Sequence, residues 1–266
     1  MSGNERRSRG RSPRADSGWD RVAGWYDGWV GQRGSTYHQR LAIPAALDLL
    51  APRAGDDILD VGAGQGVLAP LILGPGAQYT GIDVSPALIQ RARQRRPRVA
   101  RFLVGDARRL DLVAALRPAS FDAAVFLLSI ADIPDLDLVA ASLDWALRPA
   151  ARVVIVMTHP AFRQPRHSGW GYDESRKLAY RRVDGYLMPM AVPFDAVPGA
   201  GPTWSHHRPI SDYINALGAF GFRVDAMLEI PDLTPPERPG RNRDRMDNPD
   251  IPLLLGLRAS RDRGFG

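Results

Sequence analysis

The stretch Ile58-Leu59-Asp60-Val61-Gly62-Ala63-Gly64-Gln65-Gly66 decides the fold of this chain. A short apolar run ends in an acid, glycines follow at alternate positions, and a helix-compatible run (Val67 to Leu73) comes next. Glycine adopts backbone angles that are closed to other residues and lets a ligand approach the main chain closely. A helix that starts after such a turn adds unpaired N–H groups and a partial positive charge. The sequence therefore predicts a strand, a tight turn and a helix start that together bind a nucleotide-type cofactor.

The spacing of these glycines argues against a dinucleotide. The dinucleotide pattern is G-x-G-x-x-G, whereas the third glycine here comes one residue early. Asp60 would also place a second anion close to a pyrophosphate, so an acid at this position suits a cofactor with a cationic end. The stretch resembles motif I of the class I S-adenosyl-L-methionine (SAM) methyltransferases, D/E-x-G-x-G-x-G. Asp60, Gly62, Gly64 and Gly66 fill that motif without departure, and the resemblance implies that they bind SAM.

Later steps of the chain match the same family in the order that it requires. Asp83 ends the second predicted strand and Val84 follows it, and the resemblance implies that this acid accepts both ribose hydroxyls. A G-D-A step with Asp106 and Ala107 ends the third strand, and in the family it lies beside the adenine, with the acid accepting its amino group. The fourth strand carries S-F-D-A-A-V, similar to a D-x-V step of the family, and Ser129 after it is assigned to the cofactor as well.

Strands and helices alternate through the middle of the chain. The predicted strands are 58–62, 78–82, 101–104, 121–128 and 152–157, and the predicted helices are 66–73, 86–95, 111–116 and 135–146. Such alternation implies a parallel sheet with right-handed crossovers. A helix at 210–219 then precedes strands at 222–228 and 251–258, which lack a helix between them and should pair antiparallel. The expected fold is α/β: a doubly wound, mostly parallel seven-stranded sheet whose last strand is antiparallel, with an N-terminal helical lid and a cap insert.

The segments outside this core suggest how the site is covered. We divide the chain into a disordered arginine-rich tail (1–17) and a single methyltransferase domain (18–266). The domain contains an N-terminal lid (18–57), a SAM-binding core (58–158), a substrate cap insert (159–208) and a C-terminal helix with strands (209–266).

The lid and the cap insert are both rich in aromatic residues. The segment around Tyr26 resembles the A-x-x-Y-D segment of the family, which implies a lid whose aromatic residue covers the methionine end of SAM. The alternative is that these aromatics are the core of an amphipathic helix. The insert is too long for an ordinary connection and follows the fifth strand, so it should lie above the strand ends. We expect a hairpin or pair of short strands at 181–192, and a loop at 231–250.

The histidines all fall in the predicted lid and cap insert. His159 follows the fifth strand directly and His207 precedes a helix, so these two are the candidate general bases. The alternative for each is a hydrogen-bonded loop histidine. Asp132, Asp135 and Asp137 follow the fourth strand, and they fit the cap of the next helix better than a metal site. No metal is therefore predicted, and a base is needed only if the methyl acceptor arrives protonated.

Composition narrows the classes of function. The chain of 266 residues contains no cysteine, which excludes disulfides and thiolate metal sites. No apolar run reaches the roughly 18 residues of a membrane span, and the arginine-rich start lacks the apolar segment of a secretory signal, so we expect a cytoplasmic protein. The net charge of +6 raises the question of a nucleic-acid partner. That partner is not expected, because the N/D-P-P-Y/F motif of DNA and RNA amino-group methyltransferases is missing from the sequence.

Taken together, the sequence predicts a SAM-dependent methyltransferase that acts on a small, apolar or aromatic acceptor. The aromatic lid and cap insert favour such an acceptor. Two alternatives stay open: an RNA methyltransferase, and a methyltransferase fold that binds SAM without transferring a methyl group. No pattern identifies the acceptor, the methylated atom or the oligomeric state.

Overall fold

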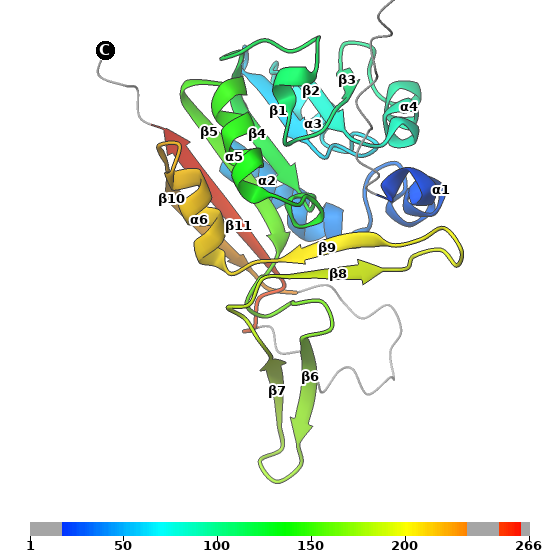
Figure 1. The fold of residues 1–266 in the computed structure, drawn as a ribbon, viewed down its shortest axis with the longest axis vertical. Coiled ribbons are helices and arrows are strands. Elements are labelled where there is room, and N and C mark those ends of the chain that lie inside the picture. Colours follow the sequence, from blue (N-terminus) through cyan, green and yellow to red (C-terminus); the bar gives the residue numbers. More distant parts are fainter. Residues whose placement is uncertain (1–17, 233–249, 262–266) are drawn as a thin grey trace, which may run out of the picture.

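The computed structural model describes residues 18–232 and 250–261, and a seven-stranded sheet forms its centre (Figure 1). The strands are β1 (Asp57–Val61), β2 (Gln78–Asp83), β3 (Arg101–Val104), β4 (Phe121–Leu127), β5 (Leu147–Thr158), β10 (Phe222–Ile230) and β11 (Leu254–Arg261). Their order is β10-β11-β5-β4-β1-β2-β3. β1 to β5 run parallel, and β11 is antiparallel to both β5 and β10. The predicted doubly wound α/β sheet with an antiparallel last strand is confirmed.

Helices cover both faces of the sheet (Figure 1). They are α1 (Trp19–Val30), α2 (Ile43–Leu50), α3 (Ala69–Leu73), α4 (Pro86–Arg95), α5 (Leu136–Ala146) and α6 (Ile210–Gly218), with a π-helical turn at His38–Ala42 and 3₁₀ turns at Leu110–Leu112 and Ile130–Asp132. The core on one face includes α5 and α6, and the core on the other includes α2, α3 and α4. Ile58 and Leu59 are both fully buried but belong to opposite cores. Successive side chains of a strand point to opposite faces, so both faces are apolar.

Some predicted boundaries differ from the structure. The helix expected at 111–116 is a single 3₁₀ turn, because its anchors are the buried Leu110 and Leu116 while Leu112 is 61% exposed. A stretch this short gains too little from helix formation without a continuous buried face. β5 begins before the predicted residue 152 because it bulges around Ala150, whose φ is 63°.

The cap insert forms two hairpins where one was expected. They are β6 (Ser168–Asp173) with β7 (Leu178–Val183), and β8 (Met190–Phe194) with β9 (Thr203–His207). The prediction for 181–192 was wrong, since that range contains the end of one hairpin, a connection with Gly185 at φ 66°, and the start of the next. Figure 1 shows β6–β7 projecting away from the sheet, whereas β8–β9 runs along the carboxyl ends of the strands toward α1.

α1 is fastened to the core on one side and meets the second hairpin on the other. Asp27 pairs with Arg91 and Arg95 of α4. The Trp25 ring lies 5.9 Å from the ring of Phe194 in β8. α1 and β8–β9 therefore meet over the carboxyl ends of the strands. The predicted tail (1–17) and most of the predicted loop (231–250) lie outside the described residues, and no helix within the described ranges is long and apolar enough to cross a bilayer.

Candidate active site

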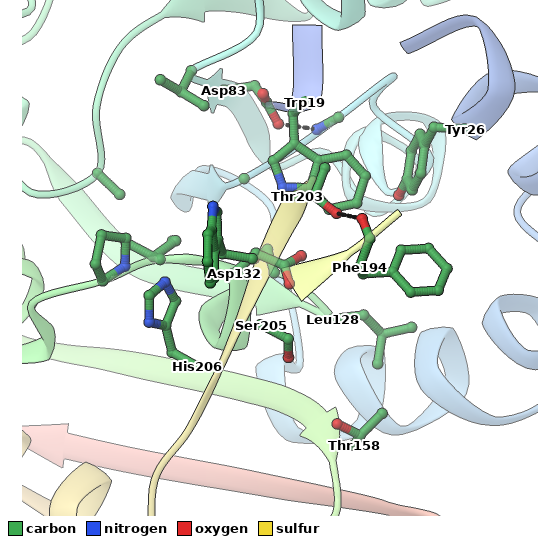
Figure 2. A pocket seen from close by; sticks show the side chains of 18 of the residues that line it. Trp19, Tyr26, Asp83, Leu128, Asp132, Thr158, Phe194, Thr203, Ser205 and His206 are labelled. Atoms are coloured by element: carbon green, nitrogen blue, oxygen red, sulfur yellow. Dashed lines mark hydrogen bonds between the residues drawn. The ribbon is translucent and has the colours of Figure 1, made fainter. Parts of the chain in front are cut away.

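A cavity of about 1200 Å³ lies at the carboxyl ends of β1, β2 and β4 (Figure 2). Its walls come from the strand-end turns on one side and from α1 and the β8–β9 hairpin on the other. Most of the predicted cofactor residues line it, namely Tyr26, Gly62, Gly64, Asp83, Val84, Asp106, Ala107 and Ser129. Asp60 and Gly66 are not in its wall. The volume exceeds the roughly 300–1,000 Å³ of a typical small-ligand site, which leaves room for a cofactor and a second molecule.

The three glycines of the turn have different roles. All have positive φ, at 71° for Gly62, 53° for Gly64 and 73° for Gly66. A Cβ on Gly62 would lie 2.5 Å from the Cβ of Ser129, and one on Gly66 would lie 2.5 Å from the ring of Phe102. A Cβ on Gly64 would meet nothing closer than 3.5 Å, where an aromatic ring of α1 lies. Gly62 and Gly66 allow close packing of the protein on itself, and Gly64 is the glycine of the cavity wall where a Cβ would meet no atom closer than 3.5 Å.

Asp83 is a buried acceptor held in place by the backbone. Its Oδ2 accepts a 2.8 Å hydrogen bond from the amide of Gly64 (Figure 2). Its Oδ1 accepts one of 2.8 Å from the amide of Ser85. Burial raises the pKa of Asp83 to about 6, against the lowering effect of these two amides. Each carboxylate oxygen keeps a further lone pair. Asp83 can therefore accept hydroxyl groups from a ligand without giving up its own support.

Asp60 is oriented differently from what the motif resemblance implied. Its Oδ2 accepts a 2.6 Å hydrogen bond from the hydroxyl of Tyr79, and its Oδ1 has no partner among the described residues. Burial raises the pKa of Asp60 to about 7, although the Tyr79 hydrogen bond lowers it. A direct ligand contact from Asp60 is not favoured, since its side chain is used to anchor β2 against β1.

Asp106 lines the cavity but is already engaged. Arg108 Nη2 lies 2.7 Å from its Oδ2, and the same guanidinium also pairs with Asp135 at 2.8 Å. Burial acts to raise the pKa of Asp106, but the Arg108 hydrogen bonds outweigh it and hold the pKa below its usual value. A contact from Asp106 to an adenine amino group would have to share this carboxylate with Arg108.

Neither predicted base lies in the wall of the large cavity. His159 is buried, with Nε2 3.2 Å from a carboxylate oxygen of Glu229 on β10. His207 is buried with Nε2 2.8 Å from the carbonyl of Tyr186. Both are hydrogen-bonded histidines at strand ends, because the directions of β5 and β9 point their rings at β10 and at the connection before β8. His206 lines the cavity instead, since alternate residues of a strand face opposite sides.

Asp132 is the residue that the sequence argument misplaced. It was expected to cap the next helix, yet α5 begins at Leu136 with Asp135 at the N-cap position, and Asp132 lines the cavity (Figure 2). Burial, followed by the negative charge of Asp83, raises the pKa of Asp132 to about 8. The sheet order offered a signal, because Asp132 follows β4 beside β1, where the strand order reverses and ligands of such sheets bind.

The acidic residues at the strand ends share one property. Asp60, Asp83 and Asp132 make no ion pair with any residue within 18–232 or 250–261, and burial raises the pKa of each. Their negative charge is uncompensated by protein cations, so the site is suited to a ligand that carries positive charge. Within the same ranges, no three His, Cys, Asp or Glu side chains come together as metal ligands.

The opposite part of the cavity is apolar. Trp19 of α1, Leu128 after β4 and Phe194 of the second hairpin line it (Figure 2). Ile133 and Trp204 line it as well. Leu128 has a φ of 57°, a strained conformation for a branched residue of the kind that collects at functional sites. The site therefore combines an acidic, hydrogen-bonding half with an aromatic half.

Comparisons with known proteins agree with this geometry. A family model described as a methyltransferase domain matches residues 59–155. The chain is 35% identical over 142 residues to the nocamycin O-methyltransferase of Saccharothrix syringae, covering 51% of this chain and 48% of that protein. It is 34% identical over 154 residues to the 2-phytyl-1,4-naphtoquinone methyltransferase of Synechococcus elongatus, covering 55% of this chain and 66% of the relative. The crystal structure of a SAM-dependent methyltransferase from Mesorhizobium loti matches with a TM-score of 0.67 and 25% identity, covering 82% of this chain and 96% of the other.

Residues 59–155 therefore match a methyltransferase domain family, and the chain shares the fold of a SAM-dependent methyltransferase. The residues of the cavity fit SAM, the cofactor of such enzymes. Gly64 presents no side chain to the cavity, the buried carboxylate of Asp83 offers free lone pairs, and acids without an ion pair suit a cationic ligand. The matched region spans 48% of the length of the nocamycin enzyme and 66% of the length of the naphthoquinone enzyme.

Proposed function

We propose that the protein transfers the methyl group of SAM to a small, largely apolar or aromatic molecule. The observation that carries this proposal is the two-part cavity, in which unpaired acids face an aromatic wall within one volume of about 1200 Å³. The relatives also support it, because their names refer to small molecules, nocamycin and a naphthoquinone.

The acidic half of the cavity would hold SAM, which supplies an electrophilic methyl group on a positively charged sulfur. Asp83 would accept the ribose hydroxyls, and Gly64 would let the ligand lie against the backbone of the turn. Asp106 and Ala107 would border the adenine, and Tyr26 of α1 would cover the ligand from the opposite side. Burial raises the pKa of the Tyr26 phenol above its usual value, so this side chain is neutral where it would contact the ligand.

The aromatic half would hold the methyl acceptor. Trp19, Phe194 and Trp204 present ring faces or edges that suit a flat apolar molecule. Fixing two reactants in line lowers the barrier by several kcal/mol, about 7–11 kcal/mol in the best intramolecular cases. α1 and the β8–β9 hairpin would also exclude water from the acceptor, which strengthens every electrostatic interaction inside the site.

We further propose that the lid, core, cap insert and C-terminal segments act as one domain, that no nucleic acid takes part, and that the protein works in the cytoplasm. The cap supports the first point, since its second hairpin forms part of the cavity wall. The other two points stay predictions from the sequence. The oligomeric state is not part of this proposal.

The proposal is tested by formation of S-adenosylhomocysteine (SAH) in the presence of SAM and a panel of candidate acceptors. The panel contains phenols, hydroxyquinones, aromatic amines, aromatic thiols and total RNA. We expect SAH with at least one small aromatic compound and none with RNA. SAM binding accompanied by SAH formation on RNA alone would contradict the proposal, as would binding without turnover of any acceptor class.

A further inference from the structure

Asp132 is fixed in the cavity wall by its neighbours on both sides. The hydroxyl of Ser129 donates a 2.6 Å hydrogen bond to the carbonyl of Val61 at the end of β1. Arg208 donates a 2.7 Å hydrogen bond to the carbonyl of Ile133. The 3₁₀ turn between them is closed by the Asp132 amide, which donates to the Ser129 carbonyl at 3.0 Å. The backbone of Asp132 is therefore tied to the glycine turn, where SAM would bind.

The carboxyl of Asp132 differs from the two other acids at the strand ends of the cavity wall, Asp83 and Asp106, in having no partner among the described residues. Asp83 accepts two backbone amides, and Asp106 is bound by Arg108. The Asp132 carboxyl makes no hydrogen bond or ion pair with any residue in the described part of the chain. Figure 2 shows it in the central part of the cavity, below Asp83 and above His206 in that view.

The charges around Asp132 favour proton uptake. Asp83 on β2 adds negative charge, and Tyr26 on α1 and Tyr213 on α6 face it as neutral phenols whose own pKa values are raised, chiefly by burial. Arg208 is the nearby cation, and it is bound to the carbonyl of Ile133. With a pKa of about 8, the carboxyl of Asp132 lies within about two units of a phenol, whose ordinary pKa is about 10. Proton transfer to a group so matched is efficient.

His206, the histidine of the second hairpin that lines the cavity, is a weaker proton acceptor than Asp132. Burial lowers its pKa, and the positive charges of Arg208 and Arg108 lower it further, against an opposing effect of Asp135. A protonated imidazole would thus be disfavoured beside these arginines, whereas a protonated Asp132 relieves repulsion with Asp83.

We propose that Asp132 is the proton acceptor of the reaction and that the methyl acceptor is a neutral hydroxyl compound, such as a phenol or enol. The inference rests on the proposed function. As the acceptor oxygen forms its bond to the methyl carbon, its O–H bond breaks and the proton passes to Asp132. The carbon–sulfur bond breaks with its electron pair on sulfur, so the positive charge and the carboxylate charge disappear together.

This account predicts a link between protons and the charge of the ligand that needs no acceptor to measure. SAM carries a positive sulfur and should drive the Asp132 proton off on binding, whereas SAH, with a neutral sulfur, should not. Calorimetric titrations in two buffers with different ionisation enthalpies, phosphate and Tris, count the protons exchanged between pH 7 and 9. We expect SAM to release up to about half a proton more than SAH near pH 8, where Asp132 is half protonated.

Variants separate this inference from the proposed function. In Asp132→Asn the difference between SAM and SAH should vanish, while Asp137→Asn, an exposed acid on α5, should keep it. Equal proton counts for the two ligands in the unchanged protein, or an unchanged difference in Asp132→Asn, would overturn the role of Asp132. Absence of SAM binding altogether would instead overturn the proposed function.

Turnover provides the second measurement. With any hydroxyl compound of the panel that is methylated, Asp132→Asn should lower kcat by about 10²–10⁴-fold and leave the affinity for SAM unchanged. It should also remove the rise of the wild-type rate with pH through the pKa of Asp132. A kcat within twofold of wild type, or methylation confined to amines and thiols, would contradict the proposal.

Discussion

Alanine substitutions at two glycines of the same turn should separate cofactor binding from folding. Gly64 and Gly66 have φ values of 53° and 73°, so alanine at either strains the backbone by about 1–2 kcal/mol. At Gly64 the new Cβ meets nothing within 3.4 Å, whereas at Gly66 it lies 2.5 Å from the Phe102 ring. Overpacking of this kind adds about 1–3 kcal/mol. Gly66→Ala should therefore lose about 2–5 kcal/mol of stability and Gly64→Ala about 1–2 kcal/mol.

The order should reverse for SAM binding. Gly64 lines the cavity and Gly66 does not, so Gly64→Ala should weaken SAM binding at least about tenfold, or 1.4 kcal/mol, and folded Gly66→Ala should bind normally. Thermal unfolding without SAM measures the first effect, at about 2–4 °C per kcal/mol for a chain of this size. Calorimetry well below both unfolding midpoints measures the second. Normal SAM affinity in Gly64→Ala, or an equal loss in both variants, would refute the assignment of the turn.

Other substitutions test the remaining parts of the site. Asp83→Asn should weaken SAM binding by about 1.5–3 kcal/mol, the value of a hydrogen bond to a charged group, and unchanged calorimetric affinity would speak against the ribose contact. The pKa of Asp60 is about 7 in the folded protein and about 4 when unfolded, so the wild type loses stability as pH rises from about 4 to 7. Over that window the free energy of unfolding of Asp60→Asn, measured with denaturant, should rise relative to wild type by up to about 4 kcal/mol. A difference in stability that does not change with pH would exclude this effect. Trp204→Ala should raise KM for the acceptor and leave the SAM dissociation constant unchanged, and an effect on SAM alone would move this ring to the cofactor half. Asp27→Asn should loosen α1 and weaken SAM binding no more than about fivefold, as expected for a partly exposed ion pair, and a larger loss would give Asp27 a direct role.

The central half of the fold was predictable because its patterns are local. Buried strands, turn glycines and the Ser85–Pro86 helix start each follow from a few adjacent residues, and Ser85 does accept a hydrogen bond from the Leu88 amide. The parallel direction of the core strands and the antiparallel last strand followed from connection rules and from the missing helix before the last strand. The two hairpins at 168–207 were not predicted, because each depends on which strands pair across a turn, and β8 also contacts α1, far away in the sequence.

The sequence indicated where the site residues lie in the fold better than it indicated what their side chains contact. The sequence placed Asp60 at the end of β1, but its side chain is taken by Tyr79 on the neighbouring strand. His206 and His207 are adjacent in the chain, and only the strand geometry decides which of them faces the cavity. In the sequence, Asp132 and Asp135 both precede a helix and look alike. In the fold they differ, because Asp135 forms an ion pair with Arg108 and Asp132 does not.

Calorimetric titration with SAM, SAH and NADH tests the central claim, that the glycine turn and its unpaired acids form a SAM site. The account predicts micromolar binding of SAM and SAH to the unchanged protein, with no heat from NADH. Loss of both affinities in Gly64→Ala would locate that binding at the turn. Binding of NADH alone would contradict the account, because Asp83 would then belong to a dinucleotide site.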